Sequence, residues 1–234
     1  MNLARRPPTP LRAMLMDLDG TVVDSHGLIV QSYNHAIRTH LGREGRYEIW
    51  HERVGLPLDE ILAATYAYYG APYTAETLEA VKASYRAYQR ANLGSIRAFR
   101  EIPETIRRVR AHGIRLAIVT TKHHEMALKH LESAALHGAF EVVVAGDDCT
   151  YCKPHPEPFL KALSALGVSS LEAVAVGDSQ HDMNGARAAG VFTIAACWGA
   201  EHRAALLATE PDALGETPSD LLSLLSLESQ DAAS

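Results

Sequence analysis

The stretch MLMDLDGTVVDS, which runs from Met14 to Ser25, decides how the chain is interpreted. Its hydrophobic start leads into Asp17, and Asp19 and Asp24 follow within the same stretch. A buried strand that ends in clustered carboxylates needs a cation, a proton or a chemical task, because like charges a few ångströms apart repel. The stretch therefore predicts a strand that delivers an acidic loop to a functional site.

The length and net charge of the chain limit the classes of protein to which it can belong. A chain of 234 residues is long enough for one large domain, or for a domain with a sizeable insertion. The formal net charge of −6 argues against a nucleic-acid partner held by bulk charge. Every apolar run is shorter than the roughly 20 residues of a membrane span, so no membrane partner is expected. The basic start MNLARRPPTP precedes an apolar run that is too short for a signal peptide.

Cysteine usage favours a reducing compartment. Three cysteines are an odd and sparse set, which fits a cytoplasmic protein. Two of them form the CxxC motif CTYC at Cys149 and Cys152. A zinc site needs four ligands and a redox pair needs a helix N-terminus directly behind it. The sequence indicates neither, so we interpret this motif as incidental.

Short apolar runs alternate with helical patterns over most of the chain, which is typical of a parallel sheet covered by helices on both faces. The expected strands lack polar alternation, as strands do when both faces are buried. They lie at 13–16, 116–119, 142–145, 173–176 and 192–195. Helices are expected at 103–113, 157–166 and 182–189, each ending at or just before a glycine.

The region from 23 to 97 breaks this alternation. It lacks a convincing strand pattern and predicts four helices, at 28–41, near Tyr47, at 58–69 and at 74–91. We therefore expect an inserted α-helical cap at 23–97 and a catalytic core built from 1–22 and 98–234. The tail from about Glu228 is expected to be disordered.

Polar side chains follow four of the expected strands, at the carboxyl ends where open parallel sheets bind ligands. Together they supply carboxylates for a hard cation, hydroxyl groups and an ammonium, a set that suits phosphoryl transfer. The groups are Asp17, Asp19 and Thr21 in DLDGT, Thr120, Thr121 and Lys122 in AIVTTK, Lys153 in YCKPHPEP, and Asp178 and Asp182 in VGDSQHD.

The stretches DLDGTVVDS, IVTTK, KPHPEP and VGDSQHDMNGARAAG resemble the four ordered motifs of the haloacid dehalogenase superfamily. The resemblance covers about 13–199, and the helical insertion is similar to the small cap that follows the first motif in that family. It implies an α/β fold with a Rossmann-like parallel sheet and an inserted helical cap. It also implies a phosphoric monoester hydrolase that uses Mg²⁺.

The resemblance assigns a role to each core residue. Asp17 would be the nucleophile that forms an aspartyl-phosphate, and Asp19 would protonate the leaving oxygen and later activate water. Asp17, the backbone carbonyl of Asp19, and Asp178 would hold Mg²⁺. Thr120 and Lys153 would bind the transferring phosphoryl group.

Asp182, Thr121 and Arg53 complete the candidate site. Asp182 would support the metal site from outside or bind through water. Thr121 stands where many relatives carry Asn or Ser, and it would contribute to substrate binding through its backbone N–H more than through its side chain. The segment ERVGLPLDEIL between two cap helices is the candidate specificity loop, and Arg53 in it could bind an anionic substrate.

Several functions share this set of residues. The segments TTK and KPHPEP are most similar to the phosphoglycolate phosphatase and pyrophosphatase branch, which predicts hydrolysis of a small soluble phosphate ester. A sugar-phosphate mutase of the β-phosphoglucomutase type is the alternative, and it would need cap cations chosen from Arg38, Arg43, Arg46, Arg53 and Lys82. Asp19 argues against a 2-haloacid dehalogenase, and length argues against a receiver domain. Selectivity lies in the cap, so the core motifs leave the ester and the oligomeric state open.

Overall fold

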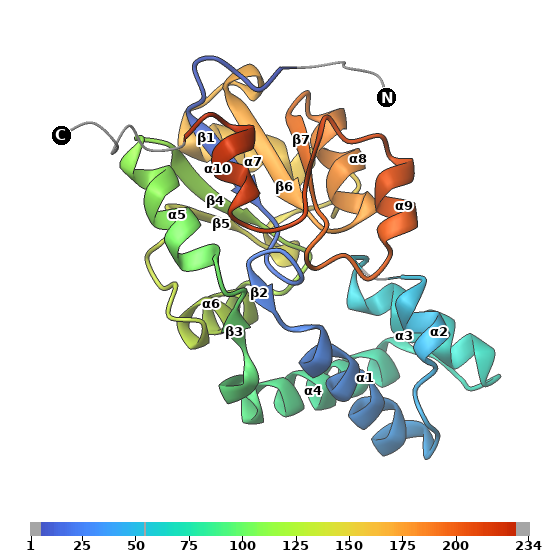
Figure 1. Cartoon of the computed structure of the whole chain (residues 1–234). Helices are drawn as coiled ribbons and strands as arrows, with labels where there is room; N and C mark the ends of the chain where they lie inside the picture. The colour runs from blue at the N-terminus through green and yellow to red at the C-terminus, as the bar shows by residue number, and fades with distance from the viewer. Residues whose placement is uncertain (1–5, 54, 228–234) are drawn as a thin grey trace.

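A parallel sheet of six strands forms the centre of the computed structural model, which describes residues 6–53 and 55–227 (Figure 1). Five strands lie within one or two residues of the expected ones. The additional strand, β8, has three residues at the edge of the sheet, too few for a hydrophobic pattern to mark it. In spatial order the strands are β5 (Val142–Val144), β4 (Arg115–Val119), β1 (Ala13–Met16), β6 (Ala173–Gly177), β7 (Phe192–Ala196) and β8 (Ala213–Gly215).

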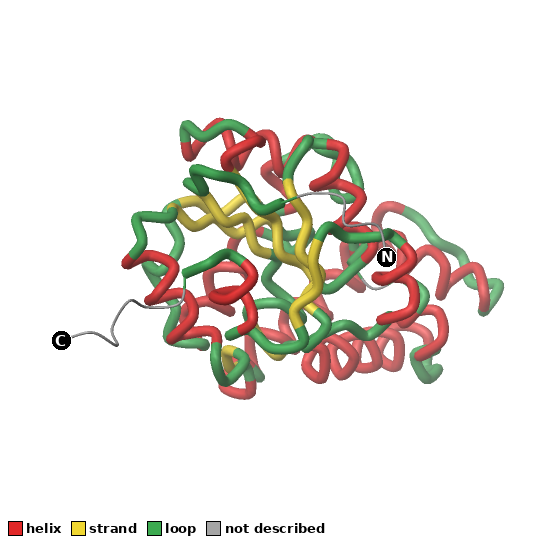
Figure 2. The backbone as a smooth tube through the Cα atoms, turned by 45° about the horizontal axis from the view of Figure 1, so that its top comes forward, coloured by secondary structure: helices red, strands yellow, loops and turns green. Residues whose placement is uncertain are grey.

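Helices cover both faces of this sheet (Figure 2). Those of the core are α5 (Ile102–Ala111), α6 (His124–Ser133), α7 (Glu157–Leu166), α8 (Gln180–Ala188), α9 (Arg203–Ala208) and α10 (Asp220–Leu224). The chain also forms three short 3₁₀ turns: η1 (Leu93–Ser95), η2 (Gly146–Asp148) and η3 (Ser170–Glu172). The expected α/β class with a Rossmann-like parallel sheet is confirmed.

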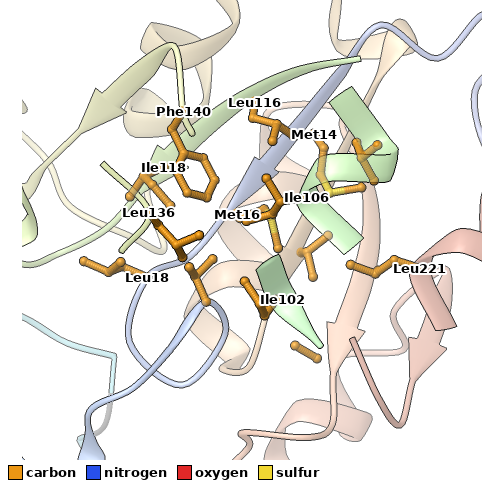
Figure 3. Packing of buried hydrophobic residues seen from close by; sticks show 14 of the residues in the cluster. Met14, Met16, Leu18, Ile102, Ile106, Leu116, Ile118, Leu136, Phe140 and Leu221 are labelled. Carbon is orange, nitrogen blue, oxygen red and sulfur yellow. The ribbon is translucent and has the colours of Figure 1, made fainter. Parts of the chain in front are cut away.

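The alternation of side chains along β1 builds two apolar layers. Met14 and Met16 point to the face covered by α5, α6 and α10, whereas Ala13 and Leu15 point to the face covered by α7 and α8. Each of the four is at most 1% exposed, so the central strand is buried on both sides. Figure 3 shows the first layer, in which labelled side chains of the strands and of α5 interdigitate: Met14, Met16, Leu116, Ile118, Ile102 and Ile106.

Four helices form a separate layer beyond the carboxyl ends of the strands (Figure 1). They pack around their own apolar cluster, in which Tyr33, Leu62 and Tyr66 are buried. A two-residue antiparallel pair, β2 (Val23–Asp24) with β3 (Arg97–Ala98), joins this layer to the core at both crossings of the chain. The four helices are α1 (His26–Leu41), α2 (Tyr47–His51), α3 (Leu58–Tyr68) and α4 (Ala75–Ala91).

Two further expectations concern the ends and the surroundings of the chain. The expected disorder from Glu228 onward lies outside the described residues. Among residues 6–53 and 55–227, no helix combines the length and the apolar character that crossing a membrane requires.

Candidate active site

The site lies where β1, β4 and β6 end, facing the helices α1–α4. Asp17 follows β1 and Asp178 follows β6, and these two strands are direct neighbours. The backbone N–H of Asp17 donates to the carbonyl of Val176 at 2.9 Å, which fixes the start of the acidic loop against β6. Core and cap residues together line a cavity of about 390 Å³ that contains Asp17, Asp19 and Asp178.

Three carboxylates crowd one side of this cavity. Oxygen atoms of Asp17, Asp178 and Asp182 all lie within 4.8 Å of one another. Burial, opposed by the ammonium of Lys153 and reinforced by repulsion from Asp182, raises the pKa of Asp17 to about 7. Burial and the charges of Asp17 and Asp182 likewise raise the pKa of Asp178 well above its usual range. One ammonium does not balance three carboxylates, and a divalent cation would restore neutrality.

Lys153 is held inside the cluster by two of these carboxylates. Its Nζ donates to Asp17 Oδ1 at 2.6 Å, to Asp182 Oδ1 at 2.5 Å and to the carbonyl of Val119 at 3.1 Å. Burial alone would lower the pKa of Lys153, but the charges of Asp17 and Asp182 outweigh it and raise the pKa above the usual value. The other oxygen of Asp182 accepts hydrogen bonds from the backbone N–H and the hydroxyl of Ser179. Asp182 therefore positions Lys153.

The carboxylate of Asp19 contacts a different set of groups. Its Oδ2 lies 3.1 Å from Lys122 Nζ, and its Oδ1 accepts a hydrogen bond from the hydroxyl of Ser25 at 2.5 Å. His130 Nδ1 approaches the same Oδ1 to 3.3 Å without the alignment of a hydrogen bond. Burial would raise the pKa of Asp19, but Lys122, His130 and Ser25 outweigh it and hold the pKa well below the usual range. Two aspartates two positions apart thus have opposite pKa shifts, because Asp17 is buried among carboxylates whereas Asp19 faces basic groups.

Gly20 allows the acidic loop to pass close to β6. Its φ is +81°, and a Cβ at this position would lie 2.4 Å from Asp178 Oδ2. Both the backbone conformation and the space therefore require glycine. The sequence DLDGT brings its two aspartates to the site because the chain can turn sharply directly after them.

The two threonines after β4 also line the cavity. The backbone N–H of Thr120 donates to the carbonyl of Val144 at 2.9 Å, which ties the loop to β5. The hydroxyl oxygen of Thr120 accepts a hydrogen bond from the backbone N–H of Lys122 at 3.2 Å. This bond turns the chain so that Lys122 reaches Asp19. Thr120 is buried at 3% exposure, and Thr121 is more open to the cavity.

The structure does not bring Arg53 to the other candidate residues. Its guanidinium donates to the carbonyl of Ile49 at 3.2 Å and contacts Glu52 at 3.1 Å. Among the described residues of its loop, Gly55, Leu56 and Pro57 line the cavity instead. A Cβ on Gly55 would lie 2.9 Å from Ser179 Oγ, so this loop meets the core at the mouth of the site.

Helix α4 supplies one face of side chains to the cavity, of which Lys82 was expected only as one of several possible cap cations. Lys82, Tyr85, Arg86 and Gln89 all line the cavity. The spacing i, i+3, i+4 and i+7 places them on one face of a helix. The helix itself was expected at 74–91, and what the sequence lacked was a signal to tell which of its faces would meet the core. His130 was missed for a related reason, because α6 was not expected.

The CTYC motif does not form a metal site with the acidic cluster. The thiols of Cys149, Cys152 and Cys197 are all free. Burial raises the pKa of Cys149 to about 11 and also raises that of Cys152, so both stay protonated near neutral pH. A protonated thiol is a poor metal ligand and a poor nucleophile.

Comparison with known proteins gives matches over nearly the whole chain. Residues 14–196 match the model of the family described as haloacid dehalogenase-like hydrolase. The chain is 32% identical over 217 residues to the pyrophosphatase PpaX of Bacillus cereus, covering 92% of this chain and 97% of that protein.

Solved structures share the same fold. A predicted phosphoglycolate phosphatase from Haemophilus somnus is 23% identical, with a TM-score of 0.83 over 92% of this chain and 98% of the other. CbbY from Rhodobacter sphaeroides, solved in complex with xylulose-1,5-bisphosphate, is 24% identical, with a TM-score of 0.82 over 92% and 99% of the two chains.

Proposed function

Because this chain belongs to the haloacid dehalogenase-like hydrolase family and is a phosphatase, we propose that it hydrolyses a small phosphate ester with the help of Mg²⁺. The reaction would pass through an aspartyl-phosphate on Asp17. One observation carries this proposal. Within one cavity, Asp17 is crowded by like charges that call for a cation, while Asp19 is kept apart among basic groups.

The acidic cluster suits Mg²⁺, which prefers carboxylate and carbonyl oxygens. Asp17 and Asp178 would hold the ion with their carboxylates, and the backbone carbonyl of Asp19 would add a third oxygen. Asp182 is left out of this set because both of its oxygens already accept hydrogen bonds, from Lys153 and Ser179. When bound, the ion neutralises negative charge on the phosphoryl group and on the nucleophile.

The protein's own groups carry out the transfer. A carboxylate oxygen of Asp17 attacks phosphorus, and the bond between phosphorus and the leaving oxygen breaks. An arriving phosphoryl group places negative charge beside Asp19 and competes for Lys122, which raises the pKa of Asp19 and lets it carry a proton. Asp19 passes that proton to the leaving oxygen. It then removes a proton from the water that attacks the aspartyl-phosphate, which regenerates Asp17.

Lys153 and Thr120 would bind the oxygens of the transferring group. Lys153 already touches Asp17, so its ammonium lies where charge develops during transfer. We further propose that residues 23–97 act as a cap on a core of residues 1–22 and 98–234. The β2–β3 pair would be the hinge, because both chain crossings lie in it. Three free cysteines fit the cytoplasm as its location.

Phosphate release from a panel of small phosphorylated compounds, with Mg²⁺ present, tests this proposal. The names of the related proteins make phosphoglycolate and pyrophosphate the first compounds to try. Release from at least one ester, abolished by EDTA, is the expected result. Conversion of glucose 1-phosphate to glucose 6-phosphate without release would instead identify a mutase. A panel that gave neither outcome would contradict the proposal.

Metal removal and Asp178 test the proposed site. Activity should disappear with EDTA and return with Mg²⁺. Replacing Asp178 by Asn should raise the Mg²⁺ concentration for half-maximal activity by about 100-fold or more, because a direct ligand loses its charge. The measurement is a Mg²⁺ titration of the rate. The double variant Cys149→Ser, Cys152→Ser is the control and should titrate like the wild type. A Mg²⁺ requirement that followed the cysteines would overturn this assignment.

The raised pKa of Asp17 predicts how pH affects stability without metal. The folded pKa of about 7 exceeds the ordinary value of 3.8, so the folded state binds more protons than the unfolded state between these limits. With EDTA present, stability from this group should fall by about 1.4 kcal/mol per pH unit as pH rises from 5 to 6, and by less per unit as pH approaches 7. His130 and His181 act in the opposite direction, because burial lowers their pKa.

Both the wild type and Asp17→Asn contain His130 and His181, so the contribution of these histidines cancels when the two proteins are compared. The free energy of unfolding of the variant, minus that of the wild type, should increase from pH 5 to pH 7 in urea titrations. Mg²⁺ should stabilise the wild type more at pH 8 than at pH 5.5, since protons compete for the same oxygens. A difference that did not change with pH would contradict the raised pKa.

A further inference from the structure

Six described side chains that can carry positive charge line the cavity, and five of them face an acidic partner. Arg86 is the sixth. Among residues 6–53 and 55–227, it has no acidic partner and no hydrogen bond from its guanidinium. The five pairs are Lys82 with Asp59 at 3.0 Å, Lys122 with Asp19 at 3.1 Å, Lys153 with Asp17 at 2.6 Å, His26 with Glu201 at 3.2 Å, and His123 with Asp147 at 3.1 Å.

Its position in α4 places Arg86 on the cap side of the cavity. It follows Tyr85, and both residues line the same cavity as Asp19. Arg86 is partly buried. A guanidinium that is partly withdrawn from water and lacks a partner is a binding group for an anion.

Lys82 cannot take this role. One turn earlier on the same face of α4, its ammonium contacts both Asp59 and Glu79, at 3.0 and 3.1 Å. Those two carboxylates already satisfy it. The core cations are committed as well, since Lys122 and Lys153 serve the acidic residues that carry the chemistry.

We propose that Arg86 determines specificity by binding an anionic group on the leaving part of the substrate, either a carboxylate or a second phosphate. This inference rests on the proposed function. The core motifs contact only the transferring phosphoryl group, which is the same in every phosphate ester. Arg86 meets the part that differs, and its planar fork of N–H donors suits either anion. The cavity of about 390 Å³ restricts the leaving part to a small molecule.

The experiment compares esters that differ in one charge. Phosphoglycolate carries a carboxylate, 2-hydroxyethyl phosphate has a neutral hydroxyl in its place, and pyrophosphate presents a phosphate. In the variant Arg86→Met, kcat/KM for one or both anionic substrates should fall by about 30-fold. This is the loss expected when hydrogen bonds to a charged group are removed. The rate on 2-hydroxyethyl phosphate should stay within about threefold. The substrate whose kcat/KM falls more identifies the kind of anion that the natural leaving group carries.

Two further variants keep the test decisive. Arg86→Lys retains the charge, so its kcat/KM for the anionic substrates should fall less than that of Arg86→Met. Arg90→Met removes another cation of α4, one that pairs with Glu125 outside the cavity, and should behave like the wild type. Thermal denaturation of each variant shows whether it is folded.

Different results would contradict the role of Arg86 and the hydrolysis of phosphate esters. A wild type that hydrolyses phosphate esters without preferring anionic ones would overturn the role of Arg86 alone. An equal loss on charged and neutral esters in Arg86→Met, or no loss at all, would do the same. A wild type that hydrolyses no phosphate ester would overturn the proposed function itself.

Discussion

Replacing Asp17 by Asn is expected to lower kcat by about 10⁴-fold or more, because an amide is a far weaker nucleophile than a carboxylate. The fold should survive. The amide is nearly the same size as the carboxylate, and its oxygen can still accept a hydrogen bond from Lys153. In the wild type, Lys153 Nζ lies 2.6 Å from Asp17 Oδ1. The variant also removes one charge from a crowded cluster. The measurement is phosphate release under saturating Mg²⁺, alongside thermal denaturation.

Asp24→Asn is the matched control for this variant. Asp24 follows the acidic loop in strand β2, where its side chain is exposed, so the same chemical change there should leave kcat unchanged. If Asp17→Asn kept more than about 1% of the wild-type rate, an obligatory carboxylate nucleophile at this position would be ruled out.

Asp19→Asn should have the second-largest effect, a loss of about 10²- to 10⁴-fold in kcat for alkyl phosphates. Asn can neither donate the proton that the leaving oxygen needs nor remove one from the attacking water. With p-nitrophenyl phosphate, whose leaving group departs without a proton, only the second step should suffer. Stopped-flow measurement should therefore show a rapid burst of nitrophenolate followed by slow turnover.

The contact between Lys122 and Asp19 provides a comparison for this result. Lys122→Met should raise the pKa of Asp19, because the pKa of this carboxyl is lowered chiefly by that ammonium once burial is set aside. It leaves the carboxyl in place, so it should not produce a burst with p-nitrophenyl phosphate. A burst in Lys122→Met, or none in Asp19→Asn, would contradict the assignment of both proton transfers to Asp19.

The sheet and the site it carries could be predicted because local signals and parallel-sheet topology agree. The apolar run at 13–16 is buried on both faces, and Asp17 comes directly after it. Asp178 comes from a strand far along the chain. The two meet because β1 and β6 are neighbours in the sheet, as the carboxyl ends of parallel strands bring their loops to one edge.

The parts that could not be predicted depend on side-chain contacts across the fold. Nothing in VGDSQHD indicates that Asp182 positions Lys153, since that contact joins α8 to the loop before α7. The burial of His130 beside Asp19 depends on how α6 packs. Arg53 looked suitable because a cation stood in a loop with Gly55 and Pro57, yet its own neighbour Glu52 and the carbonyl of Ile49 bind its guanidinium.

The central claim is that Asp17 becomes phosphorylated during turnover. Its most direct test is acid quenching of Asp19→Asn with Mg²⁺ and p-nitrophenyl phosphate during the burst, followed by proteolysis and mass spectrometry. We expect a phosphoryl group on the peptide that contains Asp17, removable by hydroxylamine, and no such group when Asp17→Asn is added to the same protein. Release of nitrophenolate with Asp17 unmodified, or a phosphoryl group on another residue, would contradict this claim.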